Sequence, residues 1–181
     1  MIKTLRTLLI GMAMAMTGGA AEAADPEDTL HMELEHGLVV IDLRPDLAPR
    51  HVARIKELVR EGFYDGLTFH RVIEGFMAQG GDPDGNGTGG SGQNIPAEFS
   101  NAKHVRGTAS MARAQNPNSA DSQFFIMFDD APFLDGKYSI WGQVTEGMKY
   151  VDMIKRGSAQ NNGSVTDPDK IIRMKIAADG Q

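Results

Sequence analysis

Short runs of alternating hydrophobic and polar residues recur along most of the chain and predict β-strands. Two such runs, 30–34 and 39–43, lie on either side of the turn residues His36 and Gly37 and predict a hairpin. Five more runs are rich in β-branched and aromatic residues, which favour strands: 68–73, 105–111, 123–128, 138–144 and 171–178. The pattern therefore predicts a single, mainly β domain.

Two segments instead carry apolar residues at helical spacing. The first begins at Pro49, has apolar residues at 52, 55 and 59, and is predicted to end at Gly62. The second is predicted to run from a Thr145 cap to Gly157, with apolar residues at 148, 151 and 154. A mainly antiparallel sheet of this size closes most naturally into a barrel, because closure leaves no edge strand unpaired. We therefore expect a barrel with a helix at each end.

The first 23 residues differ from the rest and predict a secretory signal peptide. Lys3 and Arg6 precede an apolar stretch at 8–16, and Ala21-Glu22-Ala23 forms an A-x-A cleavage site. The stretch is well short of the roughly 20 apolar residues that span a bilayer, which disfavours a membrane anchor. We expect residues 1–23 to be removed on export, leaving 24–181 as a soluble domain without membrane attachment.

Composition excludes several kinds of chemistry. The chain has 181 residues, no cysteine and a net charge of −6. Without cysteine there is no disulfide, thiol nucleophile or thiolate metal site. Without a block of lysine and arginine, a nucleic-acid groove is not expected. The histidines are scattered without the spacing of metal ligands, so we predict no metal and no other cofactor.

Four motifs occur in order along the chain and carry a resemblance to a known family. They are FHRVIEGFMAQGGD at 69–82, GTASMARA at 107–114, DSQFFI at 121–126 and FLDGKYSIWGQV at 133–144. Together they resemble the cyclophilins, which are peptidyl-prolyl cis-trans isomerases, over about residues 29–178. The resemblance implies a closed eight-stranded antiparallel β-barrel capped by two α-helices. The leader and short loops are similar to the bacterial exported branch, which implies a periplasmic enzyme. The sequence leaves the oligomeric state open, and a monomer is the default expectation.

The reaction implied by this resemblance is rotation about X–Pro peptide bonds in folding proteins. Resonance between the nitrogen lone pair and the carbonyl sets a barrier of roughly 18–20 kcal/mol. The catalyst must hold the twisted peptide better than either planar form. A guanidinium suits this task, because it stays charged and presents a rigid set of N–H donors.

The resemblance also implies roles for individual residues. Arg71 matches the catalytic arginine, with Gln79 and Phe76 beside it. The substrate-binding residues it implies are His70, Met77, Ala112, Arg113, Gln123, Phe125, Phe133, Leu134 and Tyr138. Many eukaryotic members have tryptophan at the position of Phe133 and histidine at that of Tyr138, so we expect cyclosporin to bind only weakly.

The residues alone leave other interpretations open. Arg71 could be an exposed strand arginine, and Phe76, Met77, Phe125 and Leu134 could all be core. Phe124, Ile126 and Trp141 are expected in the core in either case. The alternative function is a proline-peptide-binding or chaperone module with incidental isomerase activity. The presence of Arg71 favours the enzyme, because a binding module does not need it.

A glycine-rich stretch at 80–90, GGDPDGNGTGG, partly matches three ligand motifs. The stretch does not match a calcium-binding loop, because Gln93 stands at the twelfth position of that motif, where a glutamate is required. As a dinucleotide fingerprint it fails because Pro96 follows and no helix is predicted. The glycosylation sequons at 86–88 and 162–164 receive little weight in a protein of bacterial type. We interpret the stretch as a structural loop that shapes the rim of the groove beside Gln79.

Overall fold

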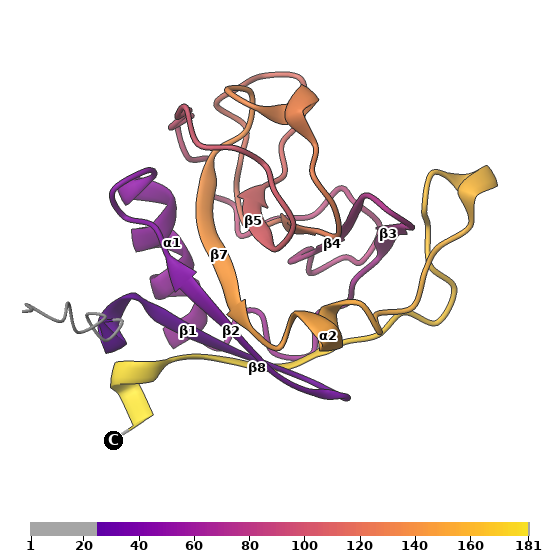
Figure 1. Cartoon of the computed structure of the whole chain (residues 1–181), viewed down its shortest axis with the longest axis horizontal. Coiled ribbons are helices and arrows are strands. Elements are labelled where there is room, and N and C mark those ends of the chain that lie inside the picture. Colours follow the sequence, from indigo (N-terminus) through magenta and orange to yellow (C-terminus); the bar gives the residue numbers. More distant parts are fainter. Residues whose placement is uncertain (1–24, 181) are drawn as a thin grey trace, which may run out of the picture.

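The computed structural model describes residues 25–180 and consists of one antiparallel sheet with two α-helices and four 3₁₀ turns (Figure 1). The strands are β1 (Thr29–Leu34), β2 (Gly37–Leu43), β3 (Arg71–Ile73), β4 (Met77–Gly80), β5 (Thr108–Met111), β6 (Phe124–Met127), β7 (Ile140–Glu146) and β8 (Ile171–Ile176). The helical elements are η1 (Pro26–Asp28), α1 (Pro49–Arg60), η2 (Pro132–Leu134), α2 (Met148–Val151), η3 (Ala159–Asn161) and η4 (Ala177–Gly180). The expected signal peptide lies outside the described residues.

The sheet is open, so the expected closed barrel is wrong. Its strand order is β3-β4-β6-β5-β7-β2-β1-β8, which leaves β3 and β8 as edges. The segments that flank these two edges approach each other but share only scattered backbone hydrogen bonds, such as Phe69 N–H to Asp169 C=O at 2.9 Å. The chain before β8 turns through left-handed positions at Asn162 and Asp167, both at φ 53°, which a strand cannot contain. The result is a half-barrel of eight antiparallel strands.

The main core lies inside the curved sheet and is organised around aromatic rings. The Phe124 ring contacts those of Tyr64, Phe69 and Trp141 edge to face, with centroids 5.7, 6.4 and 5.6 Å apart. All four side chains are fully buried, and burying one large apolar side chain contributes about 1.5–3 kcal/mol. The predicted core positions of Phe124 and Trp141 are confirmed.

Helix α1 begins at Pro49 as predicted and packs its apolar side against the sheet. Ala48 offers no side-chain cap, and the carboxylate of Glu98 takes that role from a distant loop. It accepts the backbone N–H groups of Arg50 at 3.1 Å and His51 at 3.0 Å. A carboxylate at this end also complements the helix dipole. The helix ends at Arg60, two residues before Gly62.

Helix α2 is much shorter than predicted. Thr145 does not cap it but belongs to β7, which pairs with β2 as far as Glu146. The helix starts only after Gly147, whose φ of 78° and close approach to the Leu38 carbonyl exclude a side chain. The helix then ends at Val151, well before the predicted end at Gly157.

Several strands are shorter than their sequence patterns. The run 68–73 forms a strand only from Arg71, and Phe69 before it is buried in the core. Strand β4 was not singled out in the sequence because it is only four residues long and ends in glycine.

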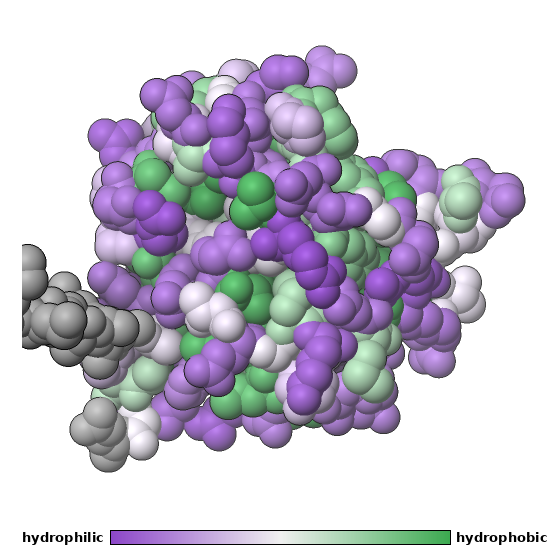
Figure 2. Space-filling model, viewed as in Figure 1, coloured by the Kyte–Doolittle hydropathy of each residue, from purple (hydrophilic) through white to green (hydrophobic). Residues whose placement is uncertain are grey.

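No helix between residues 25 and 180 is long and apolar enough to cross a membrane. The surface in Figure 2 is largely hydrophilic, with apolar residues in small patches.

Candidate active site

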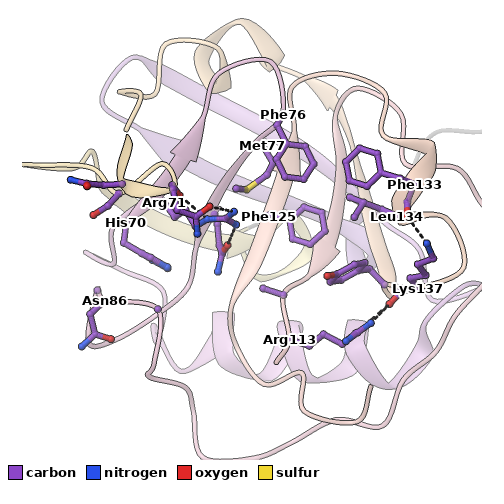
Figure 3. A pocket seen from close by; sticks show the side chains of 18 residues that line it. His70, Arg71, Phe76, Met77, Asn86, Arg113, Phe125, Phe133, Leu134 and Lys137 are labelled. Atoms are coloured by element: carbon purple, nitrogen blue, oxygen red, sulfur yellow. Dashed lines mark hydrogen bonds between the residues drawn. The ribbon is translucent and has the colours of Figure 1, made fainter. Parts of the chain in front are cut away.

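A cavity of about 840 Å³ opens where β3, β4 and β6 meet the turn η2 (Figure 3). It is lined by His70, Arg71, Phe76, Met77, Gln79, Gly85, Asn86, Gly87, Ala112, Arg113, Phe125, Phe133, Leu134, Lys137, Tyr138, Asn161, Asn162 and Ser164. Eleven of the twelve residues expected at the site are among them. The twelfth, Gln123, lines an adjoining cavity of about 220 Å³ that shares Gln79, Gly87, Ala112 and Arg113 with the first.

One half of the cavity is apolar and forms a second hydrophobic cluster, separate from the core. Met77, Phe125 and Leu134 form its buried floor, and Phe76 packs against it from the side. The Phe76 and Phe133 rings form one wall, with centroids 5.6 Å apart, and Phe133 remains 60% exposed (Figure 3). Such a hollow suits a compact apolar ring.

The alternation of β6 separates this hollow from the core. Side chains alternate across a strand, so Phe124 and Ile126 face inward while Phe125 faces the cavity. Tyr138 contacts the Phe125 ring edge to face, with centroids 5.7 Å apart. The predicted core positions of Phe124 and Ile126 are therefore confirmed, and Phe125 lines the cavity.

A buried histidine supports Phe125 from behind. The His104 ring stacks on Phe125 with centroids 6.3 Å apart. Its Nδ1 lies 3.2 Å from Asp135 Oδ1 and its Nε2 lies 3.2 Å from Ser110 Oγ. Burial lowers the pKa of His104. The pKa of Asp135 is lowered to about 2, chiefly by the hydrogen bond from the backbone N–H of His104 and also by the nearby Lys103. The pair links the chain before β5 to the end of η2.

The other half of the cavity is polar and centres on the Arg71 guanidinium. Its Nη1 donates to Gln79 Oε1, its Nε to the Asn162 carbonyl and its Nη2 to Asn162 Oδ1, each at 3.0 Å. Burial lowers the pKa of Arg71, but an arginine titrates so far above neutrality that the group stays charged. A guanidinium has five N–H donors, so one on Nη1 and one on Nη2 remain for a ligand.

A chain of amide groups continues from Arg71 to the glycine-rich loop. Gln79 Nε2 donates to Gln123 Oε1 at 3.0 Å, and Gln123 Nε2 donates to the Gly89 carbonyl at 2.9 Å. The sheet places these groups side by side, because Arg71 pairs with Gln79 and Gln79 pairs with Phe125, next to Gln123. Gln123 therefore acts on the cavity through Gln79.

The glycine-rich loop is organised by a buried carboxylate. Asp82 accepts backbone N–H groups from Asp84 at 2.9 Å and Asn86 at 3.0 Å, and a third from Gly87. Burial raises the pKa of Asp82, but these bonds outweigh it and hold the pKa below its ordinary value. Residues 85–87 line the cavity, as the structural interpretation of the loop expects. Between residues 25 and 180 no cluster of three potential metal ligands occurs.

Two further candidates line the cavity in unexpected ways. Both ring nitrogens of His70 are buried without a partner among residues 25–180, and burial lowers the pKa of this histidine.

The Arg113 guanidinium donates to the Lys137 carbonyl at 2.9 Å and lies 4.7 Å from the Tyr138 ring centre. Within the described chain no hydrogen bond engages the backbone of Arg113, whereas the N–H of Ala112 is bonded to Gln123. The Arg113 backbone is therefore free to pair with an extended peptide.

Asn162 is the main cavity residue that the sequence analysis did not single out. It appeared there only as part of a sequon. The Asn-Gly pair at 162–163 is typical of left-handed turns, but nothing in the sequence places this turn against Arg71, 91 residues earlier. Asn161, Ser164 and Lys137 also line the cavity and were not singled out, because each lies outside the strands that the sequence predicts there.

Comparison with known proteins agrees with this geometry. The family model for cyclophilin type peptidyl-prolyl cis-trans isomerase/CLD matches residues 29–176. A Brucella suis protein named "Probable peptidyl-prolyl cis-trans isomerase" is 56% identical over 97% of both chains. A peptidyl-prolyl cis-trans isomerase of Synechococcus elongatus is 43% identical over 82% of this chain and 95% of its own.

Solved structures show the same relationship. A cyclophilin from Hirschia baltica matches with a TM-score of 0.78 and 30% identity, over 87% of this chain and 77% of its own. A Cryptosporidium parvum cyclophilin type isomerase matches with a TM-score of 0.75 and 30% identity, over 82% of this chain and 98% of its own. The family match, the named relatives and the shared fold agree with one another. This chain belongs to the cyclophilin-type peptidyl-prolyl cis-trans isomerases.

Proposed function

We propose that this isomerase acts on X–Pro bonds of exported proteins as they fold, with Arg71 as its catalytic residue. One observation carries the proposal. A guanidinium with two unused N–H donors lies at the edge of an apolar hollow that suits a proline ring. The Cryptosporidium parvum relative was crystallised in the presence of the dipeptide Ala-Pro, which supports proline-containing peptides as ligands.

The apolar half of the cavity would hold the proline ring. The proline ring would pack against Met77, Phe125 and Leu134, and the rings of Phe76 and Phe133 would cover one side of it. Burial of the ring against these side chains fixes the proline while the rest of the peptide remains free to rotate. Binding energy of this kind is the same in both isomers and in the twisted state, so it supplies affinity and not rate.

Arg71 would supply the rate. One free N–H would hold the prolyl carbonyl, and the other would approach the proline nitrogen as its lone pair localises in the twisted peptide. This interaction strengthens only when resonance is broken, so it favours the transition state. The reaction moves no proton, and His70, whose pKa is lowered by burial, is neutral at pH 7. His70 would therefore contact the substrate without acting as a base.

The backbone at Arg113 would bind the peptide beside the proline. Its free N–H and C=O can pair with an extended chain as an additional strand. Ala112 would contribute its surface, because its own N–H is already used. Gln79 would orient Arg71, and Gln123 would orient Gln79. Tyr138 would close the wall behind Arg113.

Replacing Arg71 tests the catalytic role. We expect Arg71→Ala to lower kcat/KM for a proline peptide at least about 100-fold, which corresponds to about 2.7 kcal/mol. Binding of the same peptide, followed by NMR titration, should persist because the hollow is mainly apolar. Full activity in Arg71→Ala would overturn the mechanism. A wild-type protein that bound peptide without accelerating isomerisation would favour the binding-module alternative.

The setting of the reaction is part of the proposal. The basic start, apolar stretch and A-x-A site within residues 1–23 support export to the periplasm, where unfolded X–Pro-containing chains would be the partners. Fractionation of producing cells, with N-terminal sequencing of the mature chain, tests this. We also propose a monomer, tested by light scattering, and weak cyclosporin binding, tested by inhibition of the isomerase.

A further inference from the structure

Asn162 contacts Arg71 through both of its oxygen atoms. It lies directly after η3, and its carbonyl and Oδ1 accept from Arg71 Nε and Nη2, each at 3.0 Å. These two bonds engage one edge of the planar guanidinium, in the manner of a bidentate acceptor. Gln79 Oε1 binds the remaining nitrogen, Nη1. Asn162 therefore provides two of the three bonds that fix the guanidinium.

The backbone around Asn162 is fixed to the strand that carries Arg71. Asn162 adopts a left-handed conformation, φ 53° and ψ 35°, which asparagine tolerates better than most residues. The next residue, Gly163, accepts the backbone N–H of Val72 at 2.7 Å. A Cβ on Gly163 would lie 2.5 Å from Ile73 Cγ1, so only glycine permits this approach. The turn is thereby held against β3 with both oxygens of Asn162 directed at Arg71.

We propose that Asn162 is a positioning residue for the isomerisation. Two bonds along one edge set the plane of the guanidinium, so its two unused N–H groups keep one direction towards the cavity. With Gln79 alone, the side chain could rotate about a single contact. The proposal rests on the catalytic role proposed for Arg71, because a positioned guanidinium matters only if it acts on the substrate.

The chemical type of the acceptors is part of the inference. Gln79 Oε1, Asn162 Oδ1 and the Asn162 carbonyl are all neutral amide oxygens. A carboxylate in the same place would form an ion pair with Arg71. Its negative charge would offset the positive charge of the guanidinium, which stabilises the twisted peptide. Neutral acceptors fix the guanidinium while leaving its full positive charge available.

Replacing Asn162 by glycine separates its side chain from its backbone. Glycine retains the left-handed conformation and the carbonyl, and removes the side chain that carries Oδ1. We expect Asn162→Gly to lower kcat about tenfold while the affinity for a proline peptide changes less than twofold. The ¹⁵N–¹H signal of Arg71 Nε should also broaden or shift in the free enzyme. A loss of loop structure alone would not predict this split between kcat and binding.

Asp167 provides a matched control in the same loop. It has the same φ of 53°, and its side chain is exposed and is not one of the residues that line the cavity. Asp167→Gly should leave kcat within twofold of wild type. An equal fall in both variants would attribute the effect to the loop backbone and overturn the proposal.

Two further comparisons sharpen the test. Asn162→Asp should retain the hydrogen bond yet still lose activity, and full activity there would overturn the role of neutral acceptors. Full activity in Asn162→Gly together with an inactive Arg71→Ala would overturn the positioning role alone. Full activity in Arg71→Ala would instead overturn the proposed catalytic role, whatever the Asn162 variants do.

Discussion

Gln123 does not line the main cavity, yet it connects the arginine there to the neighbouring loop. Its amide accepts from Gln79 and donates to the Gly89 carbonyl, so each of its two ends has one partner. Part-buried amides held in this way fix the orientation of the next amide in the chain. At the scale of single residues, the direction of Arg71 thus depends in part on a side chain outside the main cavity.

Replacing Gln123 by leucine tests this dependence. The change keeps a similar volume and leaves Gln79 Nε2 and the Gly89 carbonyl without partners. We expect the free energy of unfolding to fall by about 1–3 kcal/mol and kcat/KM to fall about tenfold. Urea unfolding and a peptide isomerisation assay measure the two effects. Gln123→Glu keeps the acceptor for Gln79 and should lose less activity; equal losses in both variants would argue against the relay.

Single residues also show how far the sequence can predict the site. The division of β6 follows directly from strand alternation, so Phe125 could be separated from Phe124 in advance. The same rule would place Phe69 on one face with Arg71, but the regular strand begins only at Arg71 and Phe69 is buried in the core. Asn162 could not be found at all, since its contact with Arg71 depends on how a distant loop folds back on β3.

The glycine-rich loop is one element held by one side chain. Asp82 is almost completely buried, and its two oxygens accept three backbone N–H groups from 84–87. The loop has no regular structure of its own, so these bonds replace those that a strand or helix would supply. Because residues 85–87 line the cavity, the carboxylate fixes one rim of the groove.

We expect Asp82→Asn to loosen the loop. An amide offers only one acceptor oxygen, so at least one backbone N–H loses its partner, at about 1–3 kcal/mol of unfolding free energy. The amides of Asp84, Asn86 and Gly87 should exchange hydrogen faster in this variant. Asp84→Asn, an exposed change in the same loop, is the control and should leave exchange and stability unaltered. Unchanged exchange in Asp82→Asn would contradict this role.

Elements differ in how well the sequence predicts them. Helix α1 follows from Pro49 and the spacing of its apolar residues, which are local properties. The start of α2 was misplaced because pairing with β2 extends β7 through Thr145, and pairing is not local. The closed barrel failed for a related reason. Left-handed turns at Asn162 and Asp167 interrupt the chain where the last ladder would form.

At the scale of the whole molecule, three buried histidines link stability to pH. Burial lowers the pKa of His51, His70 and His104 below the ordinary value of about 6.5. His51 is neutral at pH 7 and donates Nδ1–H to Glu98 at 2.6 Å. Below about pH 6.5 the unfolded chain binds more protons at these positions than the folded chain does. Protonation therefore favours unfolding.

The unfolding free energy should accordingly decline as pH falls from about 6.5 towards 4.5. Each histidine contributes a slope of at most about 1.4 kcal/mol per pH unit. The pKa values of Asp82 and Glu98 are lowered, so their contributions are lost only at lower pH, below about 4. Urea unfolding between pH 8 and 4.5 measures the slope, and His104→Gln should reduce it. A stability that is constant from pH 8 to 4.5 would contradict this account.

The two ends of the described chain lie side by side, away from the groove. Arg60 of α1 binds both: its Nη2 lies 3.1 Å from Glu27 of η1 and its Nε lies 2.9 Å from Asp179 of η4. In Figure 1 these segments lie on the opposite side from β3, β4 and η2. The chain could therefore be circularly permuted, with Gly180 joined to Asp25 and new ends cut in a surface loop. A domain joined at Asp25 or at Gly180 would likewise leave the groove unobstructed.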